Sequence, residues 1–221
     1  MRDELTIADI QQAFVEYRAS FEEPIIAFWF ERRQGEIASA LHKALAPWNV
    51  GLENISWNQA ARNAREIQLT FGVPSLSSGF QVGIGGVTIT ALNPDWSRAP
   101  VLVSLFETGL EALKRSTGHE LQSQEVTLGF HVKPGGARPF KEIMSGLVNS
   151  KALGDEGASM YGVSVYSTDY SYVIDASGVV PGGVFIKLIR NFTAEKRFEE
   201  MATRLHRDEE DVLRRMGLKL Q

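Results

Sequence analysis

Gly85-Gly86-Val87-Thr88-Ile89-Thr90-Ala91-Leu92 decides the fold, because the same pattern returns in the second half of the chain as Gly182-Gly183-Val184-Phe185-Ile186. In both places a glycine pair opens an apolar strand, and a helical pattern follows that strand. An aromatic strand, a short helix and a pair of strands precede each copy in the same order. We therefore expect an α+β fold built as a tandem pseudo-repeat of β-α-β-β-β-α.

The two repeats are expected to span residues 23–118 and 119–221, with antiparallel sheets, helices packed on one face, and both halves packed as one unit. Residues 1–22 lie outside the repeat. Ile7, Ile10, Phe14 and Tyr17 recur there at helical spacing, which predicts an extra N-terminal helix over Thr6 to Tyr17. A single α+β domain with elements that are similar by chance remains the alternative.

The elements of the first half are read from periodicity and turn residues. We expect strands over 25–30, 52–57 and 65–71, helices over 36–46 and 99–115, and an extended segment over 80–92. The apolar positions of that segment change parity at Gly85-Gly86, which indicates a bulge or a tight turn. Gly118 is expected to end the long helix.

The second half follows the same order. We expect strands over 121–132 and 184–189, a helix over 139–153, and a hairpin of 161–166 with 170–175. A long charged helix is predicted to start at Thr193 as its N-cap and to stop at Gly217.

Composition limits the function classes. The chain has 221 residues, a formal net charge of −4 and no cysteine. The lack of cysteine excludes disulfides, thiolate metal sites and cysteine nucleophiles, and the negative charge disfavours general nucleic-acid binding. The chain shows neither the apolar core of a signal peptide nor an apolar run long enough for a membrane span. We expect a cytoplasmic protein with no membrane partner.

Aromatic residues mark the first candidate site. Four of the five tyrosines fall on the predicted hairpin, and tyrosines on a sheet face can line a ligand pocket. With one tryptophan and one strand histidine, they form the predicted ligand-binding set: Trp29, His131, Tyr161, Tyr166, Tyr170 and Tyr172. The alternative is ordinary cross-strand packing, because aromatic residues favour strands.

Two basic strand-to-helix turns mark a second candidate site. Arg32 and Arg33 lie in one turn, and Lys133 and Arg138 lie in the matching turn of the second half. Backbone N–H groups at a helix start, together with these cations, can hold an anion. Solvated polar turns are the alternative. No spacing indicates a metal site, a cofactor motif or a catalytic set: the glycines lack the dinucleotide fingerprint, and no G-x-S-x-G elbow occurs.

Three short segments resemble a family of sporadically distributed bacterial proteins of unknown function: Pro24-Ile25-Ile26, Val87 to Leu92 with Trp96 shortly after, and Leu205-His206. That resemblance implies a two-part α+β architecture and supplies no activity. The tandem pattern is also similar to effector-binding modules, which hold hydrophobic ligands between two equivalent halves above a deep carboxylate. That similarity nominates Glu66 or Glu125 for the carboxylate.

These observations favour a binding module without catalytic activity, which holds a small molecule or a protein segment in an aromatic groove between the halves. One alternative is a subunit of a protein assembly, for example a homodimer. A second is an enzyme with an unrecognised site, or a binder of phosphate backbones through the basic turns.

Overall fold

The computed structural model describes residues 6–26, 31–58, 66–135, 143 and 162–220. Within these residues the protein is a mixed α/β fold with a large antiparallel sheet and three α-helices. The chain divides into two compact units. Unit 1 comprises residues 1–13, 127–190 and 200–221, and unit 2 comprises residues 14–126 and 191–199.

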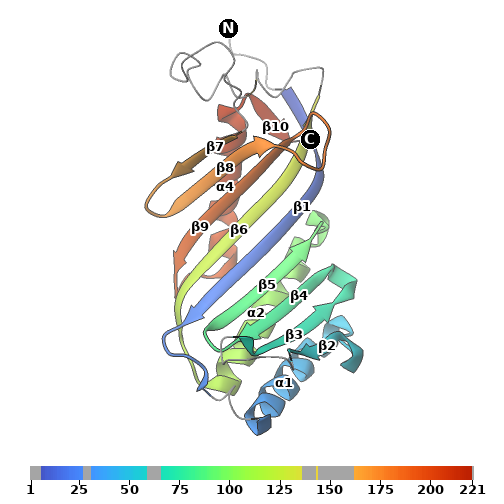
Figure 1. The fold of residues 1–221 in the computed structure, drawn as a ribbon, viewed down its shortest axis with the longest axis vertical. Helices are drawn as coiled ribbons and strands as arrows, with labels where there is room; N and C mark the ends of the chain where they lie inside the picture. The colour runs from blue at the N-terminus through green and yellow to red at the C-terminus, as the bar shows by residue number, and fades with distance from the viewer. Residues whose placement is uncertain (1–5, 27–30, 59–65, 136–142, 144–161, 221) are drawn as a thin grey trace. The chain divides into compact units, whose positions relative to one another are not determined.

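The sheet of unit 2 follows the order β2-β3-β4-β5-β1-β6 (Figure 1). Its strands are β2 (Ile55–Trp57), β3 (Gln68–Val73), β4 (Ser78–Gly83), β5 (Gly86–Leu92) and parts of β1 (Thr6–Phe21) and β6 (Leu121–Pro134). The strands β3, β4 and β5 form an antiparallel meander. Gly83 pairs with Gly86 across the hairpin, so the change of parity at Gly85-Gly86 is a tight turn.

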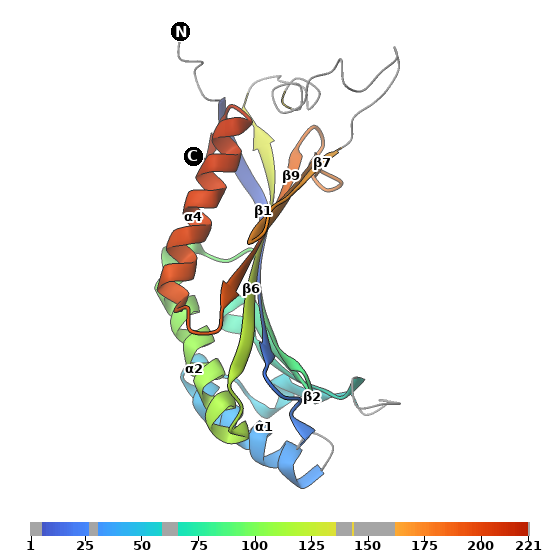
Figure 2. The same ribbon diagram turned by 90° about the vertical axis from the view of Figure 1, so that its left-hand side faces the viewer.

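Both helices of unit 2 lie on the same face of this sheet (Figure 2). They are α1 (Glu31–Leu45) and α2 (Ala99–Thr117), and α2 ends at Gly118, whose φ of 71° is left-handed, as expected. Gly109 of α2 packs directly on Phe80 of β4, where an added Cβ would lie 2.2 Å from the ring. The apolar parity of the meander faces these helices, and Leu69, Phe71, Phe80, Val82, Val87 and Ile89 are buried.

The sheet of unit 1 contains the rest of β1 and β6 with β9 (Val184–Thr193), β8 (Tyr170–Ala176) and β7 (Gly162–Tyr166), in the order β1-β6-β9-β8-β7. A short strand, β10 (Leu218–Leu220), pairs in parallel with Thr6 to Ala8 of β1. The helix α4 (Phe198–Arg215) covers one face (Figure 2). A buried ion pair between Arg190 of β9 and Asp208 of α4 ties the helix to the sheet.

The predicted N-terminal helix is wrong, because Thr6–Phe21 is strand β1. Its apolar residues fit helical spacing, but Ala13, Tyr17, Ala19 and Phe21 are buried with the two-residue period of a strand. The segment lies between β5 and β6 and hydrogen-bonds to both. Tertiary pairing therefore overrides the local pattern.

Two further boundaries differ from expectation. Thr193 is the last residue of β9 and does not cap α4. The helix starts later, at Phe198, because the Gln124 side chain binds the backbone carbonyls of Thr193, Ala194 and Lys196. Ile25 and Ile26 are not in a strand, and the remainder of the predicted 25–30 strand lies outside the described residues. The predicted 139–153 helix lies outside them too, apart from Ile143.

Candidate functional site

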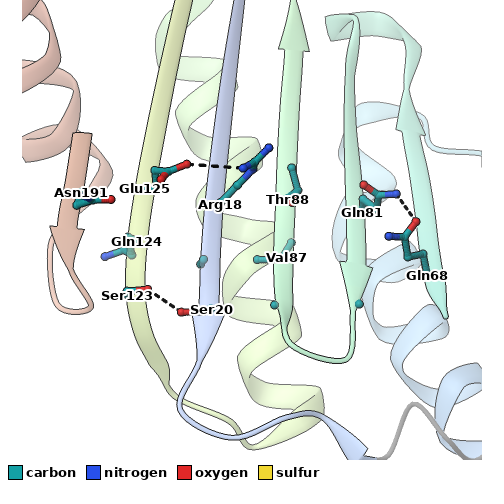
Figure 3. Close-up of a pocket in the computed structure, with 13 residues that line it drawn as sticks. Arg18, Ser20, Gln68, Gln81, Val87, Thr88, Ser123, Gln124, Glu125 and Asn191 are labelled. Atoms are coloured by element: carbon teal, nitrogen blue, oxygen red, sulfur yellow. Dashed lines mark hydrogen bonds and ion pairs between the residues drawn. The ribbon is translucent and has the colours of Figure 1, made fainter. Parts of the chain in front are cut away.

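A hollow in unit 2 lies on the face of the sheet opposite α1 and α2 (Figure 3). We call it the open-face hollow. It has a volume of about 420 Å³. Its lining residues come from β3, β4, β5, β1, β6 and the end of β9: Arg18, Ala19, Ser20, Gln68, Gln81, Gly83, Gly86, Val87, Thr88, Ser123, Gln124, Glu125 and Asn191.

Strand alternation explains why most of these side chains share a face, with Ala19, Val87 and Gln124 belonging to the buried parity instead. The buried parity of each strand meets the helices, so the other parity points to the open face. Strand register then places Gln81, Thr88 and Arg18 side by side on three neighbouring strands. The next row toward the hairpin contains Gln68, Gly83, Gly86 and Ser20 in register. The middle of that row carries no side chains, and this is the floor of the hollow.

Close packing of the backbone requires glycine at one of the two floor positions and not at the other. A Cβ on Gly86 would lie 2.2 Å from the backbone oxygen of Ala19, so glycine is required for β5 to pack beside β1. A Cβ on Gly83 would meet only the Ile67 oxygen, at an ordinary 3.7 Å. Packing therefore does not demand glycine at position 83, and a side chain there would occupy the hollow.

Polar side chains pair around this floor (Figure 3). Gln81 Nε2 donates to Gln68 Oε1 at 2.5 Å on one side, and the hydroxyls of Ser20 and Ser123 share a 2.6 Å hydrogen bond on the other. These groups are solvent-exposed and neutral. They can exchange their mutual hydrogen bonds for bonds to an incoming polar group.

One guanidinium and two carboxylates form the charged side of the site. Arg18 Nη2 lies 2.7 Å from Glu16 Oε1, and Arg18 Nη1 lies 3.9 Å from Glu125 Oε1. Arg18 is 59% exposed, whereas the side chains of Glu16 and Glu125 are 23% and 34% exposed. The cluster therefore has one more negative than positive charge.

Gln124 lines the hollow, but its side-chain amide makes its hydrogen bonds to groups in the interior. Its Oε1 accepts a 2.8 Å hydrogen bond from the hydroxyl of Tyr17. Its Nε2 donates to three carbonyls between β9 and α4, at 2.9 to 3.0 Å. Burial raises the pKa of Tyr17 well above its usual value, so the phenol stays protonated and remains the donor. This network stabilises the strand that carries Ser123 and Glu125.

The described members of the predicted aromatic set fall on two faces of unit 1: Tyr170 and Tyr172 stack with ring centroids 6.4 Å apart on one face, and Tyr166 and His131 lie on the other. Tyr172 is 6% exposed, and Arg190 stacks over the ring of Tyr170, on the face that α4 covers. Tyr166 pairs with Ser171 and therefore lies on the opposite face, where it is 79% exposed. Trp29 and Tyr161 lie outside the described residues.

His131 of β6 lies on the face of unit 1 opposite α4. Its ring stacks on Phe185 at 4.6 Å, and its Nδ1 is 2.8 Å from the Ser177 hydroxyl. Partial burial lowers the pKa of His131, so the ring is neutral at neutral pH. The hydroxyl of Ser177 also accepts hydrogen bonds from the amides of Val179 and Val180, which fixes the β8–β9 loop.

The predicted anion-binding residues are placed only in part. Arg33 of α1 is exposed and pairs with Glu36 at 2.8 Å. Lys133 is an exposed residue near the end of β6 in unit 1. Arg138 lies outside the described residues, and for Arg32 the structure describes the backbone alone.

Sequence reasoning missed most of the open-face hollow. Single serines, threonines and glutamines on alternating strands look like ordinary solvent-facing positions. Two signals were available: the glycines at positions 83 and 86, and Glu125, which the similarity to effector-binding modules nominated. Strand register was needed to bring them together.

No protein-family model matches the chain, and no curated protein sequence matches it. Among the described helices, none combines the length and apolar character needed to cross a membrane. Within the same residues, no three histidine or acidic side chains gather in a group that could hold a metal ion. The interpretation of the site therefore rests on its own geometry and chemistry.

Proposed function

We propose that the protein is a binding module that holds a small polar molecule in the open-face hollow. The observation that carries this proposal is the side-chain-free floor at Gly83 and Gly86, flanked by polar side chains from neighbouring strands. A volume of about 420 Å³ falls within the range of roughly 300–1,000 Å³ typical of small-molecule sites.

The chemistry of the lining favours a polar occupant over an apolar one. Amide and hydroxyl groups line both sides of the floor, and a hydrophobic ligand would remove them from water without giving hydrogen bonds in return. The expected aromatic groove is thus replaced in this proposal by a polar site on a different surface.

The test is native mass spectrometry of gently purified protein, with one substitution that fills the hollow. Gly83→Val adds a side chain on the floor, and the wild type should carry a bound mass that this variant loses. Gly79→Val is the matched control, because Gly79 lies on the same strand and face, outside the hollow, where a Cβ would meet its nearest neighbour at 3.4 Å. Equal adducts in all three proteins would refute the proposal.

A duplication of the chain belongs to this proposal, with β1 and β6 as equivalent strands. What supports it is the order β3-β4-β5-β1 in one half and β7-β8-β9-β6 in the other. A Cβ on Gly86 would lie 2.2 Å from the backbone oxygen of Ala19 in β1. In the same way, a Cβ on Gly183 would lie 2.8 Å from the backbone oxygen of Val132 in β6. The same kind of close backbone contact accounts for the second glycine of each pair.

By this equivalence, Arg18 and Thr88 correspond to His131 and Phe185. In the second half the stacked rings occupy the place that is hollow in the first. A single ligand site per chain is therefore proposed, in unit 2.

A second candidate function, self-assembly, is favoured by strand β7. It ends the strand order of the described residues and carries no charged side chain, although edge strands are commonly protected by charges. A second copy pairing along β7 would extend the sheet. Ser164→Lys places a charge on this exposed strand, and light scattering should then show a dimer in the wild type only. A monomer in both proteins would refute this candidate.

A further inference from the structure

We propose that the occupant of the open-face hollow is an uncharged, hydroxyl-rich molecule: a saccharide or a polyol. This inference rests on the proposed function, because it names the ligand class of the same site. It follows from the balance of charge, from the donor and acceptor inventory of the lining, and from the width of the floor.

The charge balance disfavours anions. Arg18 is the only cation that lines the hollow among the described residues, and it is already held between Glu16 and Glu125. An anion that approached Arg18 would meet two carboxylates for one guanidinium. The net local charge of −1 therefore opposes phosphates and carboxylates.

The same cluster gives a cation little advantage. A ligand cation would compete with Arg18 for the oxygens of Glu125, and it would be placed beside the positive guanidinium. The other polar side chains of the lining, from Ser20, Gln68, Gln81, Thr88, Ser123 and Asn191, are all uncharged. A neutral ligand leaves the ion pairs in place and uses the uncharged groups, together with the hydrogen-bonding positions that the ion pairs leave free.

The hydrogen-bond donors and acceptors that line the hollow match the hydroxyl groups of such a ligand. A ligand hydroxyl both donates and accepts, so it is best satisfied by partners that do the same. Serine and threonine hydroxyls and the two glutamine amides offer both functions, and Arg18 and Glu125 add a donor and an acceptor at one side. The pairs Gln68–Gln81 and Ser20–Ser123 show that these groups lie within reach of one another.

The width of the floor indicates the size of the molecule. Ser20 and Gln68 lie three strand spacings apart in one row, which is about 14 Å. A molecule of two linked rings can contact both sides of the glycine floor, and a single ring contacts one side. We therefore expect disaccharides to bind more tightly than single-ring sugars.

The experiment is ligand-observed NMR with defined probes: maltose, cellobiose and sorbitol as neutral hydroxyl-rich molecules, inorganic phosphate as the anion, and putrescine as the cation. We expect a signal from at least one neutral probe and none from phosphate or putrescine. Gly83→Val should abolish the signal, Gly79→Val should retain it, and added salt should leave it unchanged because no charge is exchanged.

Thr88→Val tests the contact itself, because valine keeps the volume of threonine and removes its hydroxyl. The affinity should fall about fivefold, the usual effect of losing one neutral hydrogen bond of about 1 kcal/mol. An unchanged affinity in Gly83→Val would overturn the inference, since the sugar would then bind elsewhere. The absence of an NMR binding signal from all three neutral probes would also overturn the inference.

The two proposals fail in different ways. If phosphate or putrescine binds and Gly83→Val abolishes that binding, the ligand class is wrong and the binding function stands. The same holds if no neutral probe binds but a native adduct is lost in Gly83→Val. If no probe binds and no native adduct depends on position 83, both proposals are refuted.

Discussion

Replacing Gln124 by leucine should weaken unit 2 strongly, because one buried amide connects three segments of the chain. Gln124 is 2% exposed, accepts from the fully buried Tyr17 hydroxyl, and donates to the carbonyls after β9. A buried polar group that loses its partner costs about 1–3 kcal/mol. The Tyr17 hydroxyl would bear this full cost, whereas the half-buried carbonyls can regain part of theirs from water.

The expected loss for Gln124→Leu is therefore about 3 kcal/mol of unfolding free energy, or about 6–12 °C in Tm for a chain of this size. Urea unfolding measures it. All four tryptophans, at positions 29, 48, 57 and 96, fall within residues 14–126, so tryptophan fluorescence reports on unit 2. Far-UV circular dichroism on the same samples checks whether the chain unfolds in one step.

A double-mutant cycle separates the hydrogen bond from the change in packing. Tyr17→Phe alone removes the donor and should cost about 1 kcal/mol. In the double variant both partners are gone, so its loss should be smaller than the sum of the single losses by at least about 0.5 kcal/mol. Strict additivity, or a loss below about 0.5 kcal/mol for Gln124→Leu, would refute the reasoning.

Two further predictions concern unit 2. Gly86→Ala should lower the unfolding free energy clearly more than Gly85→Ala, because an added Cβ meets the oxygen of Ala19 at 2.2 Å at position 86 and nothing within 4 Å at position 85; equal urea midpoints would contradict this. Above pH about 10 the unfolded chain releases the Tyr17 proton while the folded chain retains it, so unfolding free energy should fall as pH rises, by up to about 1.4 kcal/mol per pH unit. Tyr17→Phe should remove that part of the slope in alkaline urea titrations, and an unchanged slope would count against burial of the phenol.

The sequence by itself determined most of the local elements. Alternating apolar residues predicted β3, β4, β5 and the β7–β8 hairpin, because a half-buried strand leaves a two-residue period whatever lies next to it. The helix α2 and its stop at Gly118 followed from periodicity and from the left-handed conformation that glycine tolerates.

Tertiary structure decided what the local pattern left ambiguous. The segment Thr6–Phe21 fits a helix on its own and becomes a strand because β5 and β6 hydrogen-bond to both of its edges. The start of α4 moved to Phe198 because a side chain 69 to 72 residues away holds the preceding carbonyls. Neither partner is visible in a local window of sequence.

The open-face hollow depends on the same long-range information. Ser20, Gln68 and Thr88 are unremarkable as single polar residues on alternating strands, and Gly83 resembles any turn-flanking glycine. Register across four strands aligns them in two rows, and a shift of one residue would turn each side chain to the helix-covered face. The sequence determined which residues are polar, and the pairing of the strands decided that they surround one floor.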